Sequence, residues 1–317
     1  MGRLATSNTR GSTATWGKTA PLWLALALAA LAQDASAATA EPPAAAVDGV
    51  VMPAWLERAG RREPIFPGMV LQERDRIVTG SNARILLTLP EGSKVKLGEN
   101  AQLGFDALAA KREGDSVFLR SAMNVLTGAF RFTTSALSKA TNHREVNIRL
   151  ATVTAGIRGT DLWGKQGGAK EIVCLLEGKI EVARDPIAGQ STAPVILDQP
   201  LQFYIAPKGE PTLPIGRVAD AQLAQWALET EIARDAGGAS VGGHWKITFA
   251  EHTAFDEAMN LYDELRNQGY PAVFHPDRRS GKRVYLVQLP NLSSEGDAQA
   301  LAAKLLGAGM GYASVSR

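Results

Sequence analysis

The stretch RILLTLPEGSKVKL, residues 84–97, sets the fold class of the first half of the chain. Its opening run of β-favouring apolar residues ends at Pro90, where a Pro-Glu-Gly turn allows the chain to reverse. After the turn, Val95 and Leu97 alternate with two lysines, so one side of the strand is apolar and the other charged. The stretch therefore predicts a β-hairpin with one buried and one solvated face.

The same texture extends from residue 49 to about residue 205. Short runs of Val, Ile, Leu and Thr are separated by Gly, Pro, Asn or Asp roughly every 8–12 residues, a spacing typical of all-β domains. Residues 146–150 (VNIRL) alternate apolar and polar side chains like the hairpin. We expect residues 49–205 to form a β-rich domain, either a sandwich, a roll or a short β-coil.

The next segment, residues 206–242, joins this domain to the last one. Three prolines within 206–214 disfavour a central strand. A helix is expected from Arg217 to Arg234, because Leu223 and Trp226 fall on one helical face. The Gly/Ala/Ser-rich run 236–243 has the composition of a flexible linker and is the clearest domain boundary in the sequence.

Residues 243–317 follow a β-α-β-β-α-β pattern, which predicts a small α+β, ferredoxin-like domain with two helices on one face of a four-stranded antiparallel sheet. Its strands are expected at 245–249, 272–275, 284–289 and 311–315, and its helices are expected to begin at Thr253 and at Ser293 or Ser294.

The N-terminus has the features of a secretory signal. Basic residues precede an apolar run over 20–32, and the small residues of Ala35-Ser36-Ala37 follow it. The run of about 13 residues is shorter than the roughly 20 that a membrane span requires. We expect a cleaved signal peptide over residues 1–37, with an uncleaved anchor as the alternative, then a disordered Ala/Pro-rich stretch over 38–48.

Charge and cysteine content limit the class of partner. Loss of residues 1–37 would remove 3 of 34 basic and 1 of 32 acidic residues, leaving 31 of each. A balanced chain has no long-range attraction to nucleic acid, so we expect no nucleic-acid partner. The single cysteine, Cys174, excludes an intramolecular disulfide, and its apolar neighbours predict a buried, inert thiol. No later segment is apolar enough to span a membrane, so a periplasmic location is expected.

Motifs for catalysis or metal binding are missing from the sequence. The histidines stand outside zinc-binding patterns and are expected to be solvated, and neither a nucleophile elbow nor a phosphate-binding glycine loop is found. We therefore expect no catalytic residue, no metal, no cofactor and no enzymatic activity. The histidines are His143, His244, His252 and His275.

The β-rich half resembles a FecR domain over roughly residues 47–185. The motif VTAGIRGTD at 153–161 is similar to the family's V-x-T-P-x-A-x-x-x-V-R-G-T, and Gly159 within it is expected at a backbone position of positive φ or close approach. Arg158 is expected to anchor to backbone carbonyls or to Asp161, with binding of an anionic ligand as the alternative. The other matching segments are Pro67–Leu71, Asp75–Ala83, Glu91–Ser93, Leu97–Gly98 and Glu177–Val182.

The C-terminal unit resembles a SPOR domain. Its first strand and helix align without gaps on the family's Y-x-V-Q-x-G-S-F pattern, and residues 285–292 align on the third strand, with several substitutions in both. The resemblance implies binding of peptidoglycan glycan strands stripped of stem peptides, at the open face of the sheet. Strand parity and the aligned motif place the candidate glycan-binding residues there. These residues are Lys246, Thr248, Glu251, Leu286 and Gln288.

Together these features predict a non-enzymatic envelope protein connected with cell division. Its SPOR-like part binds peptidoglycan, and its FecR-like part contacts an envelope protein or senses a signal. The alternatives are a FecR-type signalling regulator and a protein-binding scaffold whose SPOR-like fold does not bind glycan. A FecR-type signalling relay needs a membrane span and a cytoplasmic anti-sigma segment. The residues before Ala20 are too short and polar to form that cytoplasmic segment.

The signal-peptide hypothesis predicts cleavage after Ala37. N-terminal sequencing of the exported protein is expected to begin at Ala38, because signal peptidase accepts small residues at the two flanking positions of Ala35-Ser36-Ala37. Recovery of the full-length chain from the inner membrane would contradict this and favour the anchor.

Overall fold

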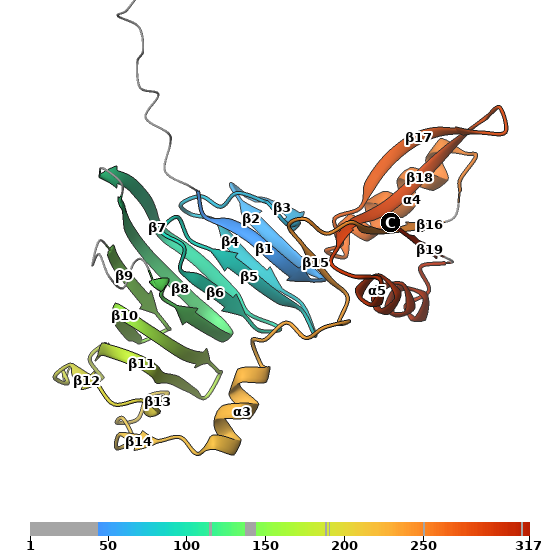
Figure 1. Cartoon of the computed structure of the whole chain (residues 1–317). Coiled ribbons are helices and arrows are strands. Elements are labelled where there is room, and N and C mark those ends of the chain that lie inside the picture. The colour runs from blue at the N-terminus through green and yellow to red at the C-terminus, as the bar shows by residue number, and fades with distance from the viewer. Residues whose placement is uncertain are drawn as a thin grey trace, which may run out of the picture. The chain divides into compact units, whose positions relative to one another are not determined.

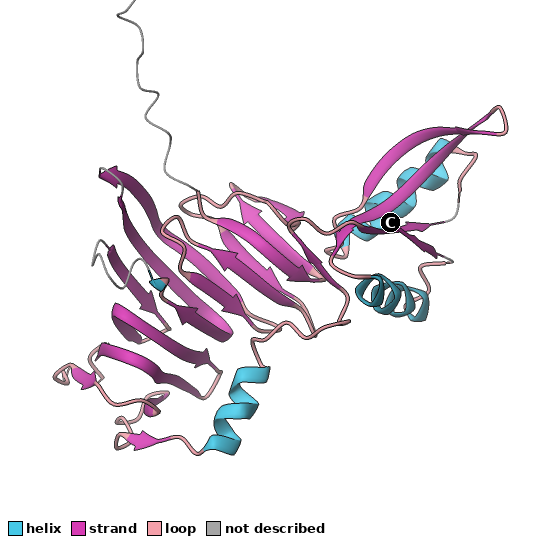
Figure 2. Cartoon of the chain, viewed as in Figure 1, coloured by secondary structure: helices cyan, strands magenta, loops and turns pink. Residues whose placement is uncertain are grey.

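The computed structural model describes residues 44–317 except 114–115, 137–143, 188, 190, 250 and 312. Strands dominate the first part of the chain, and helices alternate with strands in the last part (Figure 1, Figure 2). The first part comprises β1 (Ala46–Val51), β2 (Ala54–Arg58), β3 (Arg61–Pro64), β4 (Arg76–Thr79), β5 (Arg84–Thr88), β6 (Lys94–Leu97), β7 (Gln102–Glu113), β8 (Ser116–Thr133), β9 (Arg144–Arg149), β10 (Val153–Gln166), β11 (Lys170–Arg184), β12 (Val195–Leu197), β13 (Gln202–Pro207) and β14 (Gly216–Arg217). After it come α3 (Asp220–Leu228), β15 (Gly238–Ser240), β16 (Trp245–Phe249), α4 (Phe255–Asn267), β17 (Val273–Arg279), β18 (Lys282–Leu292), α5 (Glu295–Gly307) and β19 (Ala313–Ser316).

Three long strands in the β-rich part change partners halfway along. The first half of β8 pairs with β7 and β9, and its second half pairs with β6 and β10. β10 pairs with β9 and then with β8, and β11 pairs with β13 and then with β12. The strands therefore form two sets joined through β8, β10 and β11. Buried side chains of both sets belong to one apolar cluster.

The change of partners along β10 and β11 coincides with a β-bulge at two glycines. Register shifts between Arg158 and Asp161, and Gly159 and Gly178 adopt φ of 73° and 94°. The left-handed backbone predicted at Gly159 is confirmed. A Cβ at Gly178 would lie 2.6 Å from the Gly159 carbonyl oxygen, so a side chain has no room there. The Arg-Gly-Thr motif is thus a corner in the strand.

Hydrogen bonds close this corner. At the end of β8, the Thr134 hydroxyl donates to the Thr160 carbonyl oxygen at 2.8 Å and accepts from the Thr160 backbone N–H at 3.1 Å. These bonds satisfy buried backbone groups that the bulge takes out of the ladder. The expected anchoring of Arg158 to Asp161 lies outside the described side chains, and both Asp161 carboxylate oxygens accept from Arg131, at 3.0 and 2.7 Å.

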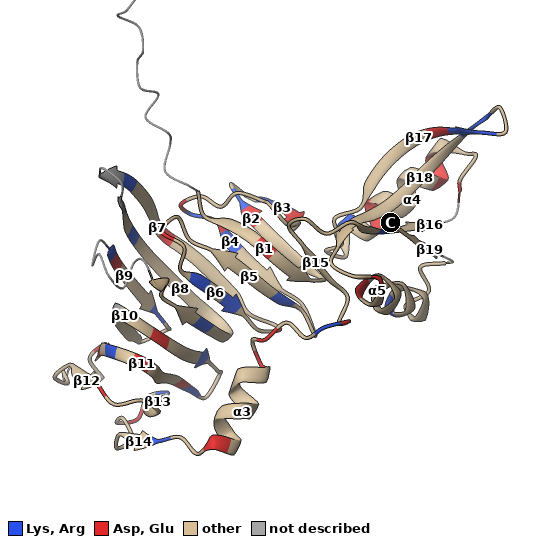
Figure 3. Ribbon diagram, in the orientation of Figure 1, with Lys and Arg blue, Asp and Glu red and all other residues tan. Residues whose placement is uncertain are grey.

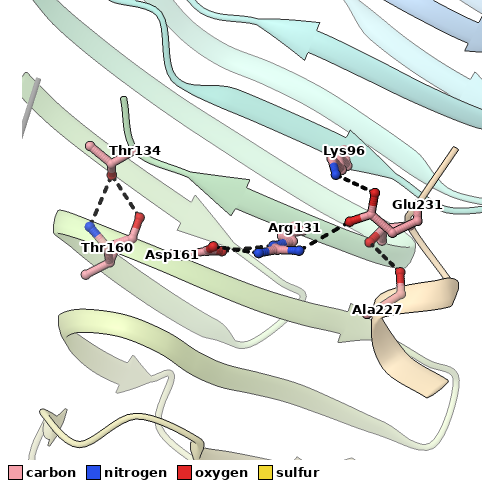
Figure 4. A network of polar contacts seen from close by, with 8 residues as sticks. Lys96, Arg131, Thr134, Thr160, Asp161, Ala227 and Glu231 are labelled. Carbon is pink, nitrogen blue, oxygen red and sulfur yellow. Dashed lines mark hydrogen bonds and ion pairs between the residues drawn. The ribbon is translucent and has the colours of Figure 1, made fainter. Parts of the chain in front are cut away.

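The parity predicted for the opening hairpin is confirmed, because Val95 and Leu97 are fully buried in the core. The prediction of a solvated opposite face is wrong for Lys96. Its ammonium donates to Glu231 at 2.6 Å, and Glu231 also accepts from Arg131 at 3.2 Å (Figure 4). The segment after α3 covers this part of the face.

The chain from α3 to Glu231 docks on the β-rich part through aromatic and charged contacts. Trp226 of α3 stacks on Trp163 of β10 with ring centroids 4.6 Å apart, and Lys165 donates to Glu229 at 2.7 Å. The helix was expected over 217–234 but ends at Leu228. Just beyond its end, Glu229 and Glu231 accept hydrogen bonds from cations of the sheet.

The expectation of a flexible linker over 236–243 is wrong. Residues 238–240 form β15, which pairs with β1 on one edge and with Leu292 of β18 on the other. Asp297 of α5 accepts from the backbone N–H groups of Gly237 and Gly238 at 3.1 and 2.9 Å. Small residues are needed here for close packing rather than for flexibility, since Gly238 and Ala239 are buried.

The expected disorder over 38–48 is wrong for its last residues. β1 begins at Ala46 and pairs with β5, and Ala45 and Val47 are buried in the core. Apolar burial and strand pairing outweigh the Ala/Pro-rich composition at this point.

The last part of the chain has the predicted β-α-β-β-α-β order. Its strands pair in the order β19–β16–β18–β17, all antiparallel. Ile247 of β16 and Val287 of β18 pack with Leu265 of α4 and Leu301 of α5 in the apolar cluster. Ser294 caps α5 by accepting from the Asp297 backbone N–H at 3.0 Å, as the sequence predicted.

Further contacts join the helical part to β2 and to the short link between β1 and β2. The Gly269 carbonyl accepts from the Ala54 backbone N–H at 3.2 Å, and Lys304 of α5 donates to the Met52 carbonyl at 2.9 Å. None of the helices in the described part of the chain combines the length and the apolar character of a membrane-spanning helix.

The glycine corner predicts a large cost for a side chain at Gly178. Gly178→Ala is expected to lower the free energy of unfolding by at least about 2 kcal/mol, from the unfavourable φ and the contact with the Gly159 carbonyl. Gly168→Ala is the matched control, because a Cβ there meets no atom within 4 Å and its φ is ordinary. Urea unfolding measures both variants. Equal midpoints would contradict the proposed role of the corner.

The buried carboxylate at β15 predicts protection from proteases. Residues 236–243 are expected to resist limited proteolysis in the wild type. Asp297→Ala leaves two backbone N–H groups without their acceptor, at a cost of about 1–3 kcal/mol, and is expected to open this segment to cleavage. Glu295→Ala, an exposed acid in the same helical turn, is the control and is expected to leave the segment protected. Rapid cleavage of the folded wild type within 236–243 would instead support the expectation of a flexible linker.

Candidate functional site

A groove of about 700 Å³ runs along the face of the C-terminal sheet opposite to α4 and α5. Parity produces it, because alternate side chains of β16 and β18 point to the helices and the others point away. The residues that line it are Lys246, Thr248, Phe249, Glu251, Asp277, Arg279, Leu286, Gln288, Ser314 and Ser316. All five candidate residues derived from the sequence are among them.

Uncharged polar groups form the middle of the groove. Thr248 pairs with Gln288 across β16 and β18 and with Ser314 across β16 and β19, so these three side chains form one row. The Gln288 side-chain amide donates to the Thr248 hydroxyl at 2.9 Å. Leu286 lies beside this row and is only 6% exposed, so it contributes an apolar patch of floor.

Charged residues lie toward both ends. Lys246, near the start of β16, donates to the carbonyl of Arg317 at 3.2 Å. Far along β17, Arg279 forms an ion pair with Glu251 and a weaker one with Asp277 at 3.4 Å. The groove therefore carries cations at either end and two carboxylates beside one of them.

Sequence reasoning missed the contributions of the outer strands. Asp277 and Arg279 were not considered, because the strand expected at 272–275 extends to Arg279. Ser314 and Ser316 of β19 were also not named. The signal for all four is the two-residue period of an edge strand, which places them on the open face once the strand's full length is known.

The aromatic residues near the sheet lie on its other side. Tyr285 stacks on Phe274 with centroids 5.6 Å apart and meets Phe255 of α4 edge to face at 5.5 Å. Trp245 packs against the core, as parity predicted. Phe249 is the aromatic residue among those lining the groove, and it is only 2% exposed. Contacts in this groove are therefore polar and charged rather than stacked.

The expectation of solvated histidines holds at His275, which is exposed, but not at His252. His252 forms a β-bridge with Tyr285 of β18, and its side chain is only 20% exposed. Its Nδ1 lies 3.6 Å from a Glu257 carboxylate oxygen. His244 is also exposed, as expected, and His143 lies outside the described residues.

Cys174 is buried, as predicted from its neighbours. Burial raises the pKa of its thiol to about 12, so the reactive thiolate is scarce at neutral pH.

A second groove, of about 750 Å³, lies in the β-rich part on β9 to β12. Its walls mix both charges with apolar side chains, among them Lys179, Glu181 and the half-exposed Ile196. This mixture does not indicate one small ligand and is closer to the composition of a protein-contact surface.

Comparison with known families confirms both resemblances drawn from the sequence. Residues 75–181 match the FecR protein family, and residues 242–316 match the SPOR domain. Both are binding or regulatory families rather than catalytic ones. A search of curated proteins finds no match.

Two crystal structures, each described as "a putative anti-sigma factor from Parabacteroides distasonis ATCC 8503", align with the chain. Their sequence identities are 16% and 15%, and their TM-scores are 0.36 and 0.37. The alignments cover 74% of this chain and 92% and 91% of the other. So low a TM-score supports no inference about function.

Proposed function

Because the chain carries a FecR domain followed by a SPOR domain, we propose that it is a non-enzymatic envelope protein that binds peptidoglycan glycan strands in the groove of its C-terminal sheet. The observation that carries this proposal is the convergence of five residues from separate segments, selected by family motif and strand parity, on one groove. The preferred strands are those without stem peptides, which accumulate where the wall is remodelled during division. We further propose that the C-terminal domain has the ferredoxin-like topology of the SPOR family.

The chemistry of the groove suits a sugar chain. Ring hydroxyls can exchange hydrogen bonds with Thr248 and Gln288, which satisfy each other at 2.9 Å in the free protein. Glu251 can accept from a hydroxyl, and Lys246 can donate to one. The apolar floor at Leu286 can pack against the C–H face of a ring.

For the FecR domain we propose a protein-facing role. The groove on β9 to β12 supports it, because mixed charge with an exposed Ile196 is typical of a contact surface. The protein would then hold an envelope partner at the wall, in the periplasm, after removal of the signal peptide. A FecR-type signalling regulator is the alternative, and a partner that relays a signal on binding this groove would favour it.

Binding through the polar row predicts the effect of a double substitution. Thr248→Ala with Gln288→Ala removes both partners of one hydrogen bond and so leaves no unsatisfied group in the fold. Each loss is expected to cost about 0.5–1.5 kcal/mol of binding, and together they lower affinity for peptidoglycan sacculi on the order of tenfold. Co-sedimentation with amidase-treated sacculi measures the effect.

The matched control is Thr253→Ala with Gln299→Ala, which makes the same changes at exposed positions outside the groove. It is expected to bind like the wild type. Ile247→Asp, which buries a charge under the helices, is expected to unfold the domain and marks the signal of a folding defect. If the groove double variant sediments like the wild type, the groove is not the site. If the wild type does not bind sacculi, the result favours the alternative of a protein-binding scaffold whose SPOR-like fold does not bind glycan.

A further inference from the structure

The turn that joins β17 to β18 concentrates positive charge at the end of the C-terminal sheet. Residues 278–283 read Arg-Arg-Ser-Gly-Lys-Arg, and the four basic side chains are exposed. Beyond the bridge between His252 and Tyr285, β17 and β18 pair only with each other among the described residues, so this basic tip is a two-stranded ribbon. Figure 3 shows the basic colour gathered there.

The register of the ribbon places like charges directly opposite each other. Arg279 faces Lys282, and Arg278 faces Arg283. Directly opposed like charges destabilise a strand pair, so the fold gains nothing from this arrangement. Within the described part of the chain, Arg279 alone of the four has an ion pair with a carboxylate. Conflicts of this kind between local charge and fold are expected at functional sites.

The two pairs lie on opposite faces of the ribbon. Opposed residues share a face and neighbours alternate, so Lys282 shares the groove face with Arg279, which lines the groove. Arg278 and Arg283 point to the other side. The groove thus extends from Lys246, across an uncharged polar row, to a pair of cations at the tip. Such a track fits a polymer that carries anions at intervals.

We propose that Arg279 and Lys282 bind the lactyl carboxylates of muramic acid along a glycan strand; this rests on the proposed function of the groove. In peptide-bearing strands the lactyl carboxyl group forms the amide bond to the stem peptide and carries no charge. Hydrolysis of the amide leaves a free carboxylate on every second sugar. A guanidinium or ammonium group on the groove face binds this anion through charge-assisted hydrogen bonds. At the lactyl position the cations therefore favour stripped strands, because peptide-bearing strands present a neutral amide there.

The acids beside Arg279 tune this contact. Glu251 and Asp277 hold the guanidinium at the groove in the free protein but also repel an incoming carboxylate. Glu251→Gln keeps a polar group and removes one negative charge, so it is expected to tighten binding of stripped strands by about twofold to threefold.

The experiment compares two double variants of the mature chain with the same loss of charge. R279Q/K282Q removes the groove-face pair, and R278Q/R283Q removes the opposite pair. The probe is purified amidase-treated glycan strands, used untreated or after carbodiimide coupling of their carboxylates to ethanolamine. The groove-face variant is expected to bind untreated strands about tenfold more weakly than wild type, and the opposite-face variant within about twofold. The single variant Lys282→Gln, which disturbs no ion pair among the described residues, is expected to lose about threefold.

The coupled strands test the ligand side of the same contact. Wild type is expected to bind them as weakly as R279Q/K282Q binds untreated strands, and added salt is expected to weaken only the wild-type contact with untreated strands. Wild-type binding of both probes with equal strength would overturn the inference while leaving the proposed function intact. Loss of wild-type binding to every strand would instead overturn the proposed function.

Equal weakening of both double variants would also overturn the inference, because it would show that charge matters without regard to face. Vesicles containing anionic phospholipid then test the alternative that the basic tip binds a membrane surface. A tip of that kind is expected to bind the vesicles through both pairs of basic residues. Circular dichroism confirms that each variant is folded, which is expected because all four side chains are exposed.

Discussion

The architecture of the β-rich part depends on a backbone that turns a corner at two glycines. Gly159 and Gly178 adopt left-handed conformations where β10 and β11 face each other, and a Cβ at Gly178 would lie 2.6 Å from the Gly159 carbonyl oxygen. Because both strands bend there, each contributes to two sets of partners, and apolar side chains of both sets meet in one core. The Arg-Gly-Thr motif that marks the family thus reports a packing requirement.

Docking of the segment after the β-rich part follows from the face that this corner creates. Arg131 and Lys96 lie on the outer side of β8 and β6, where Asp161 and Glu231 neutralise them. With Trp226 stacked on Trp163, these contacts hold the chain from α3 to Glu231. β15 then pairs with strands of both domains, and Asp297 holds its backbone. The SPOR domain is therefore connected through a paired strand rather than through a flexible linker.

The sequence was informative where a pattern is local and misleading where partners are distant. Alternation identified the hairpin face, the open face of the last sheet and four of the five groove residues, because side-chain direction depends only on strand parity; the aligned SPOR motif supplied Glu251. The segment 236–243 looked flexible because its burial depends on β1 and α5, which are far away in the chain. The end of β17 was missed because a basic, polar ribbon has low strand propensity and is held by its turn, where Ser280 and Gly281 both have positive φ.

The composition of the groove decides what kind of binding it can support. Polar contacts exchanged with water contribute about 0.5–1.5 kcal/mol each, and exposed ion pairs about 0–1 kcal/mol. A groove without an exposed aromatic platform lacks the larger contribution of stacking, and part of every gain offsets the entropy of association. Under the proposed function, one short stretch of glycan strand would therefore be held weakly. A polymer, however, offers the same stretch many times, so a released protein meets another copy at high local concentration. Weak, repeated contacts keep a protein on a region of wall while letting it move along the strand, which suits localisation better than permanent capture.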